Sequence, residues 1–482
     1  MGRALLLGVL LLAGLLALVL WRVLPGQRTH ALTSTSFRQL EASGVGHGAI
    51  DRLLPLQDRE FVDPSELVAA AEALLEPAEV ERIGERLRRS IRTRPCGPNR
   101  SARRVHRIQS SRDHPLYDRL RAHTLVPQAE LPAVPTQLVF LPGDRGAFVL
   151  GKLGELAHFD AAFHATSALH IPGVYQGGGD QGAVAVLPAP DFPESCHLYV
   201  AFVSEAGDRN VVQRLCWEGD AEAAAESLVD VLRFPKDDAL EVHGIGGLHF
   251  TGDGTLLVAV GDPSQDHAQR SFDLEGKLLA VPPEHLKPGF FVIPHGARFA
   301  TLRSFLSWPR PTIVASGLRA PFSLTPWRGM LLIGDVGDDG WGSHEEIQLY
   351  SAPGANYGWP ECRDPDLHAD HDPPLLAYRR GDPAPGLDDP AQPRTTARAV
   401  VVGAVYDGAP DRYGGLLTDR LIYTDYAMGF VRGARLQSDG AVRDDVFLTH
   451  VDYVTDLAVG PDGYLYGVSA AGDGGLFRLE LR

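Results

Sequence analysis

Short apolar runs in this chain are joined in pairs by turns rich in glycine and aspartate, and this pattern recurs from residue 134 onward. Each run has the length of a β-strand, and turn pairs such as Asp-Gly predict that two successive runs form a hairpin. The clearest hairpins lie at residues 138–150, 248–260, 322–333 and 457–468, and related ones lie at 184–203 and 399–423.

Six hairpin units at spacings of roughly 45 to 80 residues are typical of a β-propeller whose blades carry loop insertions. Radial repetition leaves only short sheet edges and encloses a central funnel. A β-sandwich would explain the alternation of apolar and polar residues but not the repeated pattern. We therefore predict an all-β fold, a six-bladed β-propeller over residues 134–482.

The region before the propeller follows a helical pattern. Apolar residues recur three or four positions apart between Pro64 and Arg92, and Asp63 before Pro64 is a favourable helix start. Residues 28–133 are therefore expected to form a mainly helical N-terminal extension.

Residues 4–21 form an uncharged apolar run between Arg3 and Arg22, just long enough to span a bilayer as a helix. A cleaved signal peptide has a shorter apolar core and a small-residue cleavage site, and no convincing site follows Trp21. We expect residues 1–27 to be a transmembrane anchor, with a cleaved signal as the alternative. Either interpretation exports the main domain to the periplasm or the extracellular space, and cleavage would make the protein secreted.

The formal net charge of -16 argues against nucleic acid as a partner, because phosphate binding needs clustered lysine and arginine. Against this acidic background, residues 86–107 carry many arginines. Such a run is usually a solvated face. The sharper interpretation is a basic segment that contacts an acidic protein partner or an anionic membrane surface.

Four cysteines permit two disulfides. Cys196 and Cys216 flank two strand-like runs joined by a short turn, so a hairpin would bring them together. Cys96 and Cys362 would then be left to pair between the N-terminal region and the main body, and four buried thiols are the alternative. No CxxC motif occurs, so the sequence suggests neither a cysteine-rich zinc site nor a covalently attached c-type haem.

A series of short motifs follows in a fixed order: His243-Gly-Ile-Gly, Gly261-Asp262, Gly276-Lys277-Leu278, Gly317-Leu-Arg319, Asp335-Val-Gly337, Glu345-Glu346-Ile347 and Asn356-Tyr-Gly-Trp-Pro360. In this order the motifs resemble the glucose/sorbosone dehydrogenase family. Its members are six-bladed propellers, and many of them oxidise sugars with pyrroloquinoline quinone (PQQ) and calcium.

The resemblance implies roles for individual residues. His243 falls on the general base that takes the proton of the sugar hydroxyl, a task that suits imidazole because its pKa lies near neutral pH. Arg319 falls on the arginine that polarises the quinone carbonyl. The segment from Gln181 to Phe192 matches a stretch that places Gln181 at a contact with cofactor and substrate.

The same resemblance implies a metal site and a wall for the cofactor. Gly337 and Asp338 would offer main-chain carbonyls to a calcium ion, which prefers oxygen ligands. Tyr357 and Trp359 would line the flat cofactor. Taken singly, each of these residues also has a structural interpretation, as a turn, an ion pair or core packing; their joint order favours the functional one.

Two positions depart from the resemblance. Asp407 and Met428 stand where PQQ enzymes of the family carry cations that meet the cofactor's carboxylates, and losing them would weaken PQQ binding. Two functions therefore stay open. The first is an exported, membrane-tethered PQQ- and calcium-dependent dehydrogenase that oxidises an aldose-type sugar or related alcohol and passes electrons to an external acceptor. The second is a catalytically silent propeller that serves as a binding or accessory subunit. A metal-dependent propeller hydrolase is less favoured, because no compact set of metal ligands is apparent.

Overall fold

The structure of the chain, a computed structural model, describes residues 30–31, 40, 45, 47–56, 59, 64–76, 79–80, 92–93, 105–143, 145–236, 241–264, 267–269, 273–289, 291–292, 311–338, 343–360, 362–363, 365, 371–380, 398–407, 410–470 and 474–482. The chain divides into two compact units, the first made of residues 1–95 and 340–342 and the second of residues 96–339 and 343–482.

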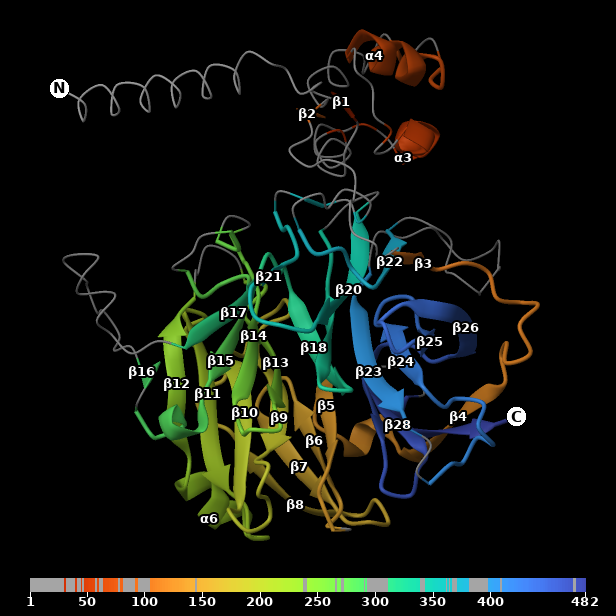
Figure 1. The fold of residues 1–482 in the computed structure, drawn as a ribbon. Helices are drawn as coiled ribbons and strands as arrows, with labels where there is room; N and C mark the ends of the chain where they lie inside the picture. Colours follow the sequence, from red (N-terminus) through yellow and green to blue (C-terminus); the bar gives the residue numbers. More distant parts are fainter. Residues whose placement is uncertain are drawn as a thin grey trace, which may run out of the picture. The chain divides into compact units, whose positions relative to one another are not determined.

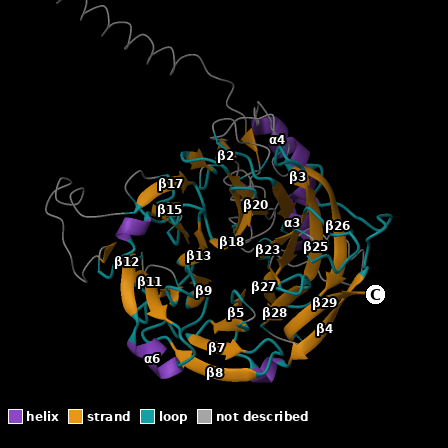
Figure 2. Ribbon diagram, turned by 60° about the horizontal axis from the view of Figure 1, so that its bottom comes forward, coloured by secondary structure: helices purple, strands orange, loops and turns teal. Residues whose placement is uncertain are grey.

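The second unit is a ring of six antiparallel sheets around a central axis, which confirms the predicted propeller (Figures 1 and 2). Each sheet contributes one inner strand, and every inner strand contacts the inner strands of both neighbouring blades, so the ring is closed. The inner strands are β5 (Pro135–Phe140), β9 (Ala183–Pro188), β13 (Ile245–Phe250), β18 (Pro321–Trp327), β23 (Val400–Tyr406) and β27 (Val454–Val459).

Outside each inner strand the blade continues outward in sequence order. These strands are β6 (Ala147–Gly151), β7 (Glu155–Phe159) and β8 (Ala165–His170); β10 (His197–Val203), β11 (Arg209–Cys216) and β12 (Val229–Pro235); β14 (Leu256–Val260), β15 (Lys277–Val281) and β17 (Thr312–Ser316); β19 (Met330–Asp335), β20 (His344–Tyr350) and β22 (Leu376–Arg379); β24 (Arg420–Asp425), β25 (Phe430–Leu436) and β26 (Val442–His450); β28 (Leu465–Ser469) and β29 (Gly475–Leu481).

Short elements decorate the blades. Three blades carry a fifth, two-residue strand that pairs in parallel at the outer edge. These edge strands are β16 (Phe291–Val292), β21 (Ala355–Asn356) and β3 (His106–Arg107), and the short helices of this unit are η2 (Gln128–Glu130), α6 (Ala221–Glu226) and η3 (Pro283–His285).

The last blade is completed by a strand that precedes the first blade in sequence. β4 (Leu120–Val126) pairs antiparallel with β29, the C-terminal strand, so the two ends of the propeller are held together by main-chain hydrogen bonds. The sequence assigned residues 120–126 to the helical extension. That assignment is corrected here, because these residues close the ring and the propeller therefore begins before residue 134.

Polar side chains join neighbouring inner strands where no backbone ladder connects them. Gln137 accepts a hydrogen bond from the main-chain N–H of Val186 at 2.6 Å, and Ser323 accepts one from that of Val402 at 2.9 Å. Asp456 accepts one from Leu138 at 3.0 Å, between the last and first blades. Such partners are needed because an unpaired buried N–H is costly.

The described part of the first unit combines helices with one strand pair. Its helices are α3 (His47–Leu53), η1 (Leu54–Leu56) and α4 (Pro64–Glu72), and β1 (His30–Ala31) pairs antiparallel with β2 (Arg92–Thr93). α4 begins at Pro64, as predicted. Leu40, Ile50, Leu53 and Leu67 form part of a separate small core, each fully buried.

No helix in the described ranges is long and apolar enough to cross a membrane. The predicted anchor, residues 4–21, and most of the basic segment at residues 86–107 lie outside the described residues.

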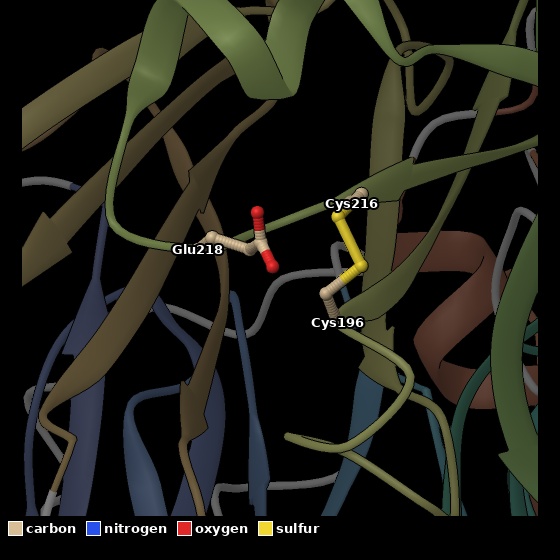
Figure 3. Close-up of side chains that lie close together, drawn as sticks. All are labelled: Cys196, Cys216 and Glu218. Carbon is tan, nitrogen blue, oxygen red and sulfur yellow. A yellow bond between two sulfur atoms is a disulfide. The ribbon is translucent and has the colours of Figure 1, made fainter.

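Cys196 and Cys216 form the disulfide that the hairpin prediction implied. They lie at the open end of the β10–β11 hairpin, where His197 is paired with Cys216. Figure 3 shows the disulfide beside Glu218, the single group of potential metal ligands found among the described residues. Because both sulfurs are bonded to each other, neither is available as a thiolate ligand. Cys362 is also disulfide-bonded, and its expected partner, Cys96, lies outside the described residues.

Removing the Cys196–Cys216 disulfide is expected to lower the free energy of unfolding by about 2 to 4 kcal/mol, because the unfolded chain regains the entropy of an open loop. Urea unfolding of the double variant Cys196→Ala/Cys216→Ala, compared with the wild type, measures this difference. Equal stability of the two proteins would show that the hairpin is held by its strand pairing alone.

Candidate active site

A cavity of about 240 Å³ lies on the propeller axis, at the end where the inner strands begin. All six blades contribute to its wall at the start of, or just before, their inner strands. These contributions include Thr136 of β5, Asp180 before β9, Ile245 of β13, Pro321 of β18, Val400 of β23 and Thr455 of β27. The cavity is thus the funnel expected from the propeller topology.

Most of the cavity wall is apolar, with Ile245, Phe322, Val336 and Val401 among its surfaces. Its polar groups are few, which is typical of small-molecule sites in which a small number of polar atoms fix the ligand's orientation. The ionisable residues at this wall are His243, Asp180, Lys152 and Tyr426, so any acid–base chemistry in the described part of the cavity depends on these four.

His243 is tied to Asp180 by two hydrogen bonds. The imidazole Nδ1 lies 2.9 Å from Asp180 Oδ2, and the main-chain N–H of His243 donates to Oδ1 at 2.9 Å. The His243 side chain is 9% exposed, whereas that of Asp180 is 40% exposed. With Nδ1 donating to the carboxylate, the proton-free nitrogen of the neutral ring is Nε2.

The Asp180 carboxylate stays ionised beside this imidazole. Burial acts to raise the pKa of Asp180, but the hydrogen bonds and the charge of His243 outweigh burial, and the net shift is downward. The pair therefore keeps its negative partner over the pH range in which an imidazole titrates. Sequence reasoning missed Asp180, although it directly precedes the predicted Gln181.

Gly261 brings the His243 and Arg319 loops together. A Cβ at Gly261 would lie 2.6 Å from the His243 carbonyl oxygen and 2.9 Å from that of Arg319. The next residue, Asp262, donates its main-chain N–H to the Arg319 carbonyl at 2.7 Å. The Gly-Asp motif is therefore required for two loops to pack without a side chain between them.

Lys152 is the cation of the described cavity wall, which contains no other lysine and no arginine. Its Nζ donates to the Gly177 carbonyl at 3.1 Å. Burial lowers the pKa of Lys152, and the charge of Asp180 acts in the opposite direction. The ammonium group is thus placed to meet an anionic group inside the cavity.

Two tyrosines pack against each other beside the cavity. Tyr426 lines it, and the ring of Tyr453 lies edge-on to Tyr426 at 5.3 Å between centroids. Tyr453 is 42% exposed, and its φ of 52° is unusual for an aromatic residue. An exposed aromatic ring held in this way offers a face to a ligand that enters from solvent.

The other predicted site residues gather around a second, much smaller cavity of about 30 Å³. It is lined by Arg319, Gly337, Asp338, Tyr357 and Trp359. Val336 lines both cavities, so the two groups of predicted residues are neighbours but do not share one pocket. Gln181 is 1% exposed and does not line the larger cavity.

Arg319 is held inside the protein. Its Nη1 donates to the Val336 carbonyl at 3.1 Å, and Nη2 lies 3.7 Å from Asp338 Oδ1. The guanidinium lies over the ring of Trp359, 5.4 Å from the centroid. These contacts fix the arginine at the wall of the smaller cavity, beside Val336, which lines both cavities.

The two residues predicted to weaken PQQ binding do not line the larger cavity. Met428 is buried in a hydrophobic cluster with Tyr378 and Phe430. Asp407 is exposed and follows the last residue of β23, whereas Val400 at the other end of that strand lines the cavity. Neither residue therefore places or removes charge at this wall.

The carbonyls predicted to bind calcium have hydrogen-bond donors in the structure. The Gly337 carbonyl accepts from Arg380 Nη2 at 3.1 Å, and the Asp338 carbonyl accepts from Ser343 Oγ. A cationic donor at a carbonyl competes with a metal for the same oxygen. The described donor set therefore does not fit calcium at this position.

The sequence model of the family described as Glucose / Sorbosone dehydrogenase matches residues 133–478. Aldose sugar dehydrogenase YliI of Escherichia coli (strain K12) is 27% identical over 359 residues, which cover 72% of this chain and 90% of that protein.

Solved structures with the same fold include a glucose dehydrogenase at 25% identity with a TM-score of 0.57, covering 74% of this chain and 98% of the other. Another is the PQQ-bound form of an aldose sugar dehydrogenase from Streptomyces coelicolor, at 19% identity with a TM-score of 0.56, covering 76% and 99%.

Proposed function

Because the chain belongs to the glucose/sorbosone dehydrogenase family, we propose that it is a PQQ-dependent dehydrogenase that oxidises an aldose-type sugar or a related alcohol. The observation that carries this proposal is the His243–Asp180 pair at an axial cavity with apolar walls. Bound PQQ would accept the two electrons, as hydride, from the substrate carbon.

The residues of the cavity fit a flat, anionic cofactor. Apolar surfaces such as Phe322 and Val401 suit the faces of a conjugated ring system, and Lys152 suits a carboxylate at its edge. His243 and Tyr426 add polar groups at the same wall. The polar groups that would hold PQQ are thus Lys152 and His243, with Arg319 one residue from the wall at Ala320.

The proton of the reaction goes to His243. Its Nε2 takes the proton of the substrate hydroxyl as the carbon loses hydride, so that the C–OH group becomes a carbonyl. The Asp180 carboxylate stabilises the resulting imidazolium. It also keeps the ring in the required tautomer, since it accepts a hydrogen bond from Nδ1–H.

Calorimetric titration of PQQ into the purified full-length chain, followed by dye reduction with a panel of aldoses, tests the proposal. Saturable binding with sugar-dependent dye reduction is the expected result. A folded protein that does not bind PQQ would contradict it, and would favour a binding or accessory subunit. The observation that supports this second function is that one lysine and no arginine lie on the described wall, whereas PQQ carries several carboxylates.

We further propose that the propeller works outside the cytoplasm and passes electrons to an external acceptor. The apolar run at residues 4–21 and the Cys196–Cys216 disulfide support export. Detergent-free fractionation distinguishes a tethered from a secreted protein. Full-length chain in the membrane fraction would support the anchor, and soluble exported chain that starts beyond residue 21 would mean a cleaved signal.

Tyr453 is expected to contribute to sugar binding. Replacing it with asparagine, which tolerates positive φ, should raise KM for the sugar about 3- to 10-fold, the usual value of an aromatic contact, with kcat nearly unchanged. Arg328→Asn is the matched control, because Arg328 is also exposed with positive φ but lies at the β18–β19 turn. An unchanged KM for Tyr453→Asn would place the sugar elsewhere.

A further inference from the structure

Three oxygens of separate chain segments converge on the guanidinium of Arg380. The Glu345 carboxylate oxygen Oε1 lies 2.7 Å from Nη2 and 2.8 Å from Nε. The carbonyls of Gly337 and Arg398 accept from Nη2 at 3.1 and 2.9 Å. One carboxylate and two main-chain carbonyls are the kind of oxygen set that proteins also use for calcium.

This group is buried. The side chains of Arg380 and Glu345 are 4% and 0% exposed. A buried carboxylate needs a nearby positive charge, and here the chain itself supplies that charge. A calcium ion bound to the Gly337 carbonyl would lie beside a guanidinium, and their mutual repulsion would be strong at this low exposure.

The negative charge of Asp338, the second residue predicted to bind calcium, is also balanced by arginines. Its carboxylate pairs with Arg363 through Oδ2 and lies 3.7 Å from Arg319 through Oδ1. Its main-chain carbonyl accepts from Ser343. Arginines therefore provide the positive charge beside both Gly337 and Asp338, the two residues that we call the Gly337 loop.

The Arg380 network also reaches the axial cavity. The other oxygen of Glu345, Oε2, accepts the main-chain N–H of Val400 at 3.0 Å, and Val400 lines the cavity. Gly337 directly follows Val336, which lines it as well. A cation at this point thus positions two wall segments that come from neighbouring blades.

We propose that Arg380 acts as the built-in cation of the Gly337 loop, and that this loop is held without calcium. That this loop supports a PQQ site rests on the proposed function, whereas the stability of the loop without calcium does not. The proposal is therefore tested on the protein without PQQ, so that a failure here is distinct from a failure to bind PQQ.

The first experiment measures thermal unfolding of the full-length chain in chelator and in millimolar calcium. We expect the same melting temperature in both. A wild-type melting temperature that falls in chelator and returns with calcium would overturn the proposal.

The second experiment removes the arginine. Arg380→Ala is expected to lower the melting temperature by several degrees, since the buried Glu345 carboxylate loses the guanidinium that pairs with it. Calcium should restore a large part of this loss, because the three oxygens then have room for the ion. Loss without recovery by calcium would contradict the proposal.

Two further variants keep the test decisive. Arg432→Ala is the matched control, because Arg432 is fully buried and paired with Asp445 at 2.6 Å in another blade; it should destabilise without any response to calcium. Arg380→Lys retains the charge and should stay insensitive to calcium even if the alanine variant does not fold. A calcium response of Arg380→Lys would overturn the proposal.

Discussion

Replacing His243 with asparagine is expected to lower kcat for sugar-dependent dye reduction by at least about 100-fold, the usual scale for loss of a general base. Asparagine tolerates the positive φ of 56° at this position, so the loop should keep its shape. The melting temperature should change little. PQQ binding should weaken, because His243 is one of the polar groups at the cavity wall, so the rate is compared at saturating PQQ. Single-turnover kinetics of the PQQ-loaded protein measure the effect.

Asp180→Asn separates positioning from proton transfer. The amide keeps the size of the carboxylate but loses its charge and can donate to Nδ1, which favours the wrong tautomer. We expect kcat to fall, because the neutral ring then carries its proton on Nε2 and the imidazolium formed in the reaction loses its stabilising carboxylate. A folded variant that keeps the wild-type rate would mean that Asp180 only supports the loop.

The chain offers a matched control for this pair. Asp160 also accepts main-chain N–H groups and lies 3.3 Å from a histidine, His164, at an exposed turn outside the cavity. Asp160→Asn should leave the rate and its pH dependence unchanged. Full activity of PQQ-loaded His243→Asn would show that another group accepts the proton.

The strands that the sequence revealed are those with continuous apolar runs. β6 and β14 are buried along their whole length, so their hydrophobic pattern and turn residues were sufficient to predict them. β4 is different, because four of its seven residues are exposed and its position depends on pairing with β29 near the other end of the chain. An edge strand with this composition carries little local signal.

The site was predictable where a motif carried it and obscure where distant segments meet. His243 was found from its motif, whereas Asp180 lies 63 residues earlier and has no local pattern that marks it as a partner. Arg380 is 43 residues from Gly337, and only the fold shows that its guanidinium reaches that carbonyl. Motif matching therefore predicted that the Gly337 and Asp338 carbonyls bind a metal, but it could not show that Arg380 contacts the first of them.

The closure of the ring has an expected signature in the pH dependence of stability. Asp456 bridges the last and first blades by accepting the N–H groups of Leu138 and Leu457. Burial raises its pKa from the usual 3.8 to about 7, and the two hydrogen bonds only partly oppose this. Between these pH values the folded protein holds a proton that the unfolded chain has released. The contribution of Asp456 to stability is therefore greatest below pH 3.8 and is lost as the pH rises toward 7.

Asp456→Asn should remove this dependence, because the amide is neutral at every pH and keeps one oxygen for the N–H of Leu138. Relative to the wild type, the variant should gain stability as the pH rises from 4 to 8, by up to about 4 kcal/mol, since each pKa unit corresponds to about 1.4 kcal/mol. Urea unfolding at several pH values measures the difference, in which the other titrating groups cancel. Asp439→Asn, at an exposed turn where Asp439 accepts the N–H of Ala441, should show no such trend. A constant difference between Asp456→Asn and the wild type would mean that the carboxylate at the blade junction stays charged from pH 4 to 8, with solvent or a cation in contact with it.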